Sequence, residues 1–232
     1  MESSRSARWR GLRLVVPLAV AVGMVAFLVV PNALGRTGAV GRTGTPGKPP
    51  HKITFHLFAN PQFLGCAQEE KQTASATVTV IRGKQTARLT MHLKGFQEDQ
   101  GYDLFTVQNS PQLADGSPDP NFTNFGLAWY QADLDIGSNH AATVKIRTIL
   151  FDEIFGFDAD TGLAPTNTFH VGIWFDDPAD AAPCGFNGAP TPFNGSHDAG
   201  PVAFISRPDA TTGLGPLCTK PDTTTNPPSC KA

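Results

Sequence analysis

The stretch Thr86–Leu93, TARLTMHL, alternates strictly between polar and apolar side chains. Its odd-numbered positions from 87 to 93 are Ala, Leu, Met and Leu, and its even-numbered positions from 86 to 92 are Thr, Arg, Thr and His. Because side chains two residues apart lie on the same face of a strand, the pattern predicts a β-strand with one buried and one solvated face. His92 is expected on the solvated face.

The segment that precedes it, Ala74–Val80, alternates in the same way. Arg82-Gly83-Lys84 separates the two segments, and its glycine can adopt the backbone conformation that a tight turn requires. Together they predict an antiparallel hairpin.

Further strand-like segments follow, separated by loops rich in Gly, Pro, Asp and Asn, and no amphipathic helix pattern lies between them. They are Lys52–Phe58, Tyr102–Gln108, Gly126–Asp133, Ala142–Leu150, Thr168–Phe175 and Pro201–Ser206. This organisation predicts an all-β domain, an antiparallel two-sheet sandwich of about eight strands.

The N-terminal region differs from the rest of the chain. Arginines at positions 5, 8, 10 and 13 precede an uncharged apolar run from Leu14 to Val30. Residues 1–30 are therefore predicted to form an apolar helix in the membrane, either a cleaved signal peptide or a retained single-pass anchor. Residues 31–50 are a Gly/Pro/Thr-rich flexible linker, 51–210 the β-sandwich, and 211–232 a Pro/Thr-rich tail.

This arrangement predicts export through the cytoplasmic membrane to an extracellular or cell-surface location. From His51 onward the chain has 11 Lys or Arg and 19 Asp or Glu residues, a net charge of −8. Binding to nucleic acid needs clustered Lys and Arg, and the sequence offers no such cluster, so nucleic acid is not an expected partner. The expected partners are the membrane, through the N-terminal segment, and an extracellular ligand or envelope component.

The four cysteines, Cys66, Cys184, Cys218 and Cys230, all fall in the part expected to be exported. An even number of cysteines in an oxidising compartment indicates two disulfides, with three possible pairings. Cys66–Cys184 within the body and Cys218–Cys230 across the tail are the favoured pairs. A metal-thiolate site is not favoured, because no Cys-x-x-Cys spacing occurs.

Two long loops, Asn109–Asn124 and Asp176–Gly200, contain few strand-forming residues. Long loops without secondary structure are uncommon in compact domains and are often functional. They are the expected binding surface. Alternatively, the second loop has no binding role, and a disulfide at Cys184 only fixes it to the domain.

The run TARLTMHLKGFQEDQGYDLFTVQ (86–108), with FHVGIWF (169–175) and GPVAFISRP (200–208), resembles the layout of CHRD-type extracellular sandwiches, whose architecture is shared with copper/zinc superoxide dismutases. The resemblance spans roughly Thr73–Arg207 and implies a fold. It does not extend to copper chemistry, because the chain has no His-x-His pair and carries Asp103-Leu104-Phe105-Thr106 where such a pair is expected.

Aromatic and histidine side chains are the candidate ligand contacts. In the segment 169–175, His170 and Trp174 share one face with Gly172 between them, which predicts a shallow groove or, alternatively, a packed histidine under the following loop. The candidate set also includes Trp129 and His197. Trp129 and its neighbour Tyr130 must face opposite sides of a strand, and His197 lies in the second long loop.

Calcium is the only cofactor that the sequence suggests. Asp158 and Asp160 stand two residues apart before a glycine, as in calcium loops, and Asp152 and Glu153 precede them. The pattern lacks the bidentate Glu after the glycine and is incomplete.

The sequence favours a non-catalytic, exported or cell-surface domain that acts as a ligand-binding or adhesion module. No Gly-x-Ser-x-Gly motif is present. Two alternatives stay open: a secreted hydrolytic or metal-dependent enzyme with a site near the 176–200 loop, and a calcium-stabilised structural domain.

Overall fold

The computed structural model describes residues 51–83, 86–148, 168–188, 199–218, 221–222 and 229–230. The predicted N-terminal helix and linker lie outside these residues. Within the described part, no helix has the length and apolar character needed to cross a lipid bilayer.

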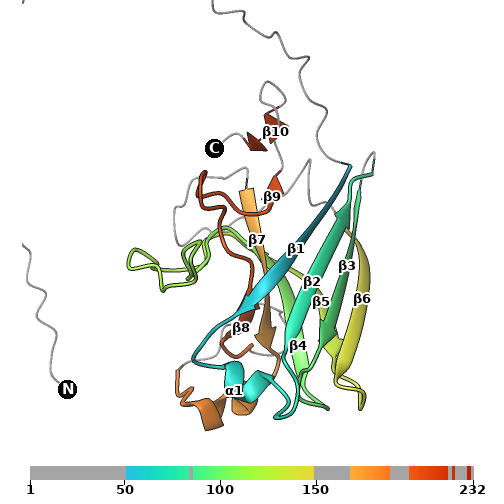
Figure 1. Ribbon diagram of the computed structural model, residues 1–232, viewed down its shortest axis with the longest axis vertical. Helices are drawn as coiled ribbons and strands as arrows, with labels where there is room; N and C mark the ends of the chain where they lie inside the picture. Colours follow the sequence, from blue (N-terminus) through green and yellow to red (C-terminus); the bar gives the residue numbers. More distant parts are fainter. Residues whose placement is uncertain are drawn as a thin grey trace, which may run out of the picture. The chain divides into compact units, whose positions relative to one another are not determined.

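The described chain is mostly β-structure, and Figure 1 shows its main strands arranged around a common interior. The strands are β1 (Lys52–Ala59), β2 (Ser75–Ile81), β3 (Ala87–Lys94), β4 (Gly101–Val107), β5 (Ala128–Asp135), β6 (Ala141–Thr148), β7 (Thr168–Phe175), β8 (Val202–Ile205), β9 (Leu217–Cys218), β10 (Pro221–Asp222) and β11 (Ser229–Cys230). The helices are α1 (Leu64–Ala67) and a 3-10 helix, η1 (Pro178–Cys184). Each of the eight predicted strands is confirmed, with ends within two residues of those expected.

The first eight strands form one antiparallel sheet in the order β5-β4-β7-β8-β1-β2-β3-β6. β1 joins its two halves, because Lys52–Leu57 pair with β2 whereas Phe58 and Ala59 pair with β8. The edge strands β5 and β6 contact each other, so the sheet curls into a nearly barrel-shaped body. The predicted division into two sheets is therefore not confirmed: the hydrogen-bonded path through β1 is continuous.

The interior of this body is the main core, and it follows the alternation seen in the sequence. Positions 87, 89, 91 and 93 of β3 are buried, whereas Arg88 and His92 are exposed, as predicted. Phe96 packs at the centre, with its ring 5.5 Å from that of Tyr102 and 4.9 Å from that of Phe204.

A second apolar cluster lies apart from the main core and joins β4, β7 and β8. It contains Phe105, Trp174 and Ile205, and partly buried side chains such as Phe125 pack against it. All eight residues of β7 are consequently buried. Burial of both faces of a strand normally requires a second layer, and here that layer is made by loops.

One end of the body is closed by α1 and η1, which the disulfide Cys66–Cys184 links. This pairing was the favoured one and is confirmed, with a Cα–Cα distance of 6.1 Å. The side chains of Cys218 and Cys230 lie outside the described part, so their pairing stays a prediction.

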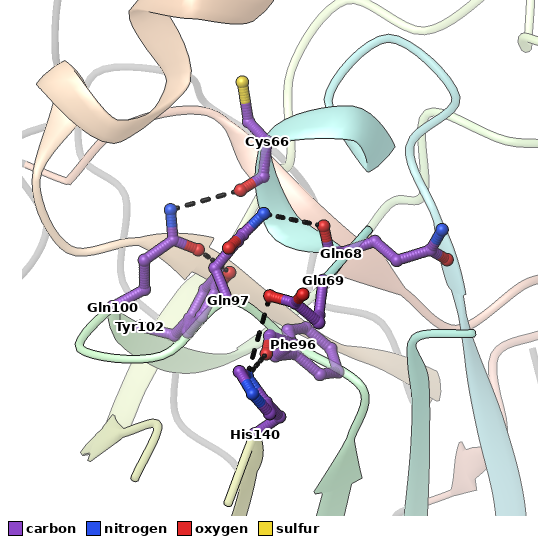
Figure 2. Close-up of polar contacts among 8 residues, drawn as sticks. All are labelled: Cys66, Gln68, Glu69, Phe96, Gln97, Gln100, Tyr102 and His140. Atoms are coloured by element: carbon purple, nitrogen blue, oxygen red, sulfur yellow. Dashed lines mark hydrogen bonds and ion pairs between the residues drawn. The ribbon is translucent and has the colours of Figure 1, made fainter. Parts of the chain in front are cut away.

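Glutamine side chains hold α1 at this end, as Figure 2 shows. The Gln97 amide donates to the carbonyl of Gln68 at 2.8 Å, and the Gln100 amide donates to the carbonyl of Cys66 at 3.1 Å. The Tyr102 hydroxyl donates to Gln100 Oε1 at 2.7 Å. These bonds satisfy backbone carbonyls at the end of a short helix, which has few internal partners for them.

His140, in the turn between β5 and β6, completes this network (Figure 2). Its Nδ1 lies 3.1 Å from the carbonyl oxygen of Phe96 and 3.8 Å from Glu69 Oε2. A carbonyl oxygen can only accept, so Nδ1 carries the hydrogen. The turn between the edge strands is thus linked to the segments that follow β3 and α1.

Candidate functional site

A pocket of about 440 Å³ lies beside the start of β7. Loop 109–124, His170 and the segment 208–214 contribute to its walls, and most of the lining side chains are amides or hydroxyls. The amides and hydroxyls are those of Gln108, Asn109, Ser110, Gln112, Asn121, Thr123, Asn124 and Thr168; Asp119 adds a carboxylate and Phe122 an aromatic ring. The volume falls within the range typical of small-molecule sites.

Loop 109–124 has a defined backbone although it contains no strand. The carboxylate of Asp115 accepts hydrogen bonds from the backbone N–H and the hydroxyl of Ser117, at 2.9 and 2.7 Å. These bonds lower the pKa of Asp115. Asp119 accepts from the backbone N–H of Asn121 at 2.8 Å. Such turns, in which an Asp side chain replaces a backbone acceptor, pre-organise the loop before a ligand arrives.

Gln112 anchors the same loop to the sheet. Its amide nitrogen donates to the carbonyl of Ala59 at the end of β1, at 2.8 Å, and its amide oxygen accepts from Arg207 Nε at 2.9 Å. The Arg207 guanidinium lies 4.1 Å from the ring centroid of Phe58. The pocket wall is therefore attached to β1 and to the segment after β8.

His170 lies in this pocket with 4% of its surface exposed. Its Nδ1 is 2.9 Å from the carbonyl oxygen of Ser206 and 3.1 Å from Ser206 Oγ. The carbonyl can only accept, so Nδ1 carries the hydrogen and Nε2 is an unprotonated acceptor. Burial lowers the pKa of His170 to about 4, so the ring is neutral near pH 7. Nε2 has no partner among the described residues and is the ring atom left to meet a ligand.

Trp174 shares the outer face of β7 with His170, as predicted, but the gap expected at Gly172 is filled. A Cβ at Gly172 would lie 2.7 Å from the indole ring of Trp174, so the ring covers the glycine. Trp174 is fully buried and packs edge-on against Phe105 and Phe125, with centroids 5.2 and 4.9 Å away. Its indole N–H has no acceptor among the described residues. The ring also lines a smaller apolar hollow of about 230 Å³.

Trp129 and Tyr130 lie on β5 and differ in exposure. Trp129 is 42% exposed, whereas Tyr130 packs against Phe105 with a centroid distance of 5.6 Å. Partial burial and a hydrogen bond to Asp133 raise the pKa of Tyr130. Trp129 does not line either pocket described above.

Three carboxylates converge elsewhere on the sheet. Asp103 of β4 pairs directly with Asp133 of β5, and Asp176 follows β7. One oxygen from each lies within 4.8 Å of the others, and Asp103 is buried. These groups are of the type that can hold a cation. The three residues are far apart in the sequence, and only the pairing of β4 with β5 and with β7 brings them together.

Several predicted site residues fall outside the described part of the chain. They are His197 and the calcium candidates Asp152, Glu153, Asp158 and Asp160. Their roles stay predictions. The sequence analysis singled out His170 but missed the amide side chains around it; their density in the first long loop was the available signal.

No family model, curated protein or solved structure matches this chain. The resemblance to CHRD-type sandwiches therefore stays a prediction.

Proposed function

We propose that this chain is an exported or cell-surface β-domain that binds a ligand without transforming it. The observation that carries the proposal is the pocket beside β7, which the buried, neutral His170 lines together with a pre-organised loop rich in amides. Amides and hydroxyls both donate and accept, and the described residues that line the pocket include no Lys or Arg. Phe122 adds an apolar ring face. This combination fits a neutral polyhydroxy ligand, such as a sugar unit of an envelope component.

The same histidine is poorly suited to acid–base catalysis. A general base works best with a pKa near the operating pH, and the pKa of His170 is about 4. Its Nδ1–H faces Ser206, so it cannot take a proton from that hydroxyl. Asp176 lies six residues further along the chain, about 20 Å away at the rise of an extended strand. These relations favour binding over a hydrolytic mechanism built on His170.

We also propose the N-terminal organisation and the two-layer arrangement of strands that the sequence suggested. Residues 1–30 act as a signal peptide or anchor, and the linker 31–50 connects them to the β-domain. The two halves of the sheet, β1-β2-β3-β6 and β8-β7-β4-β5, correspond to the facing layers of the CHRD-like sandwich, with β1 shared between them.

Isothermal titration of the full chain with neutral oligosaccharides of glucose, galactose and N-acetylglucosamine tests this function. We expect at least one of them to bind. His170→Asn should weaken binding about tenfold or more, because asparagine keeps a donor to Ser206 but loses Nε2. Asn121→Ala, an exposed change in the pocket wall, should weaken it less.

His92→Asn is the matched control, because His92 is exposed on β3 and its Nδ1 contacts Thr143 in a comparable way. This variant should bind like the parent. Absence of binding to every oligosaccharide, or equal losses in the His92 and His170 variants, would overturn the proposal.

A further inference from the structure

The strands β1, β2, β3 and β6 carry an unusual distribution of charge. Their sequences contain five Lys or Arg residues and no Asp or Glu, although the chain from His51 onward has a net charge of −8. The basic residues are Lys52, Arg88, Lys94, Lys145 and Arg147. The acidic surplus therefore lies elsewhere, and this half of the sheet is locally basic.

Strand register brings three of these charges, Lys52, Arg88 and Arg147, to one end. Arg88 of β3 pairs directly with Arg147 of β6, and Lys52 of β1 lies in the same row through Ile81 of β2. Both arginine side chains are exposed, and neither has an acidic partner among the described residues. Like charges directly opposite each other on neighbouring strands are destabilising. A pair of this kind is stabilised when an anion lies between the two groups.

A hollow of about 400 Å³ is present at this place, at the end of β2 and the start of β3. Arg88 and Arg147 line it together with Arg82 and His51, and none of the described residues that line it is acidic. Gly83 lies next to Arg82, and a Cβ at this position would clash with the carbonyl oxygen of Thr86. The hollow thus has three guanidinium groups in its lining, those of Arg82, Arg88 and Arg147.

We propose that this hollow is a binding site for a phosphate group. Guanidinium groups present a planar fork of N–H donors that matches phosphate oxygens in a two-bond geometry. The sequence analysis found no basic cluster because these arginines are far apart in the chain and only the pairing of β3 with β6 brings them together. The site is separate from the pocket at His170, since the two share no lining residue. The phosphate can be a free anion or part of a lipid headgroup.

Isothermal titration of the full chain at constant ionic strength tests the site, with sodium pyrophosphate in one arm and glycerophosphoglycerol, the soluble headgroup of phosphatidylglycerol, in the other. We expect one or both to bind at millimolar concentration or below. Arg88→Gln/Arg147→Gln should weaken binding at least about tenfold, the size expected for charge-assisted hydrogen bonds. Tighter binding of the headgroup would assign the site to lipid, and tighter binding of pyrophosphate to a free phosphate.

Lys94→Gln is the matched control, because Lys94 is exposed on the same face of β3, about 20 Å from Arg88 at the rise of a strand. It should change the affinity less than twofold. Thermal melting of the arginine variants should stay at or above that of the parent, since the change removes a repulsive pair. The proposal is overturned if neither probe binds, if the double variant binds like the parent, or if Lys94→Gln weakens binding as much.

Discussion

The outer faces of the two halves of the sheet differ in how far they are buried. On β1, β2, β3 and β6 that face meets solvent and carries Thr, His, Lys and Arg side chains. On β4, β7 and β8 nearly every residue is buried, because loops and the second apolar cluster cover the strands. We refer to the half that contains β1, β2, β3 and β6 as the bare half, and to the half that contains β4, β7 and β8 as the covered half.

This difference separates two kinds of candidate site. The covered half has the depth for a pocket that shields a histidine from water, and burial there lowers the pKa of His170. No described segment covers the outer face of the bare half, so its candidate site depends on charge at the surface rather than on burial. The following experiments test that distinction, beginning with the largest expected effect.

Replacing Trp174 by alanine should destabilise the protein by about 3–5 kcal/mol, because the ring is fully buried in the second cluster. Urea unfolding followed by circular dichroism measures the change. Trp129→Ala, at a site 42% exposed on β5, should cost less than about 1 kcal/mol. Similar losses in the two variants would mean that the covered half gains little from its outer layer.

Removing the Cys66–Cys184 disulfide by a double change to alanine should cost about 2–4 kcal/mol. The bond joins residues separated by 118 positions and links the connection after β1 with the segment after β7, so it constrains both halves in the unfolded chain. Differential scanning calorimetry of the double variant checks this value. An unchanged melting temperature would show that the glutamine network alone holds that end.

Acidification should destabilise the covered half through His170. The pKa of its side chain is about 4 when folded and 6.5 when unfolded, so the unfolded state binds more protons between these values. Stability therefore decreases as the pH falls through 6.5 towards 4, by about 3 kcal/mol in total, and this contribution is constant above and below that window.

Urea unfolding at pH 7.5, 6, 5 and 4 measures this effect as the difference between the parent and His170→Asn, which lacks the titrating group. His92→Asn, the same change at an exposed histidine on the bare half, is the matched control. Parallel pH profiles for the parent and His170→Asn would show that His170 is not held neutral by burial.

The smallest effect concerns the bare half. Arg88→Thr should stabilise the protein by about 0.2–1 kcal/mol at low salt, because it removes a like-charge pair with Arg147. The gain should shrink at 1 M NaCl, where the repulsion is screened. A destabilising effect at low salt would mean that Arg88 has a favourable role in the free protein.

Strand positions and the solvated face of the bare half were predictable from sequence, because alternation of polar and apolar residues is a local property. Thr86–Leu93 illustrates this, since its apolar residues face the core and its polar residues face the solvated side, as the alternation predicts. The pairing of Cys66 with Cys184 was also anticipated, from the even number of cysteines, the expected oxidising compartment and the position of the tail. These inferences need no knowledge of which segments are neighbours.

Other features depend on contacts between distant segments, and local patterns do not encode them. β1 changes partners after Leu57, loop 109–124 forms a wall of the pocket at His170, and β3 sets Arg88 opposite Arg147. Likewise, the space above Gly172 depends on how the Trp174 ring packs. Register and packing result from the free energy of the whole fold, so they became visible only when the strands were assembled.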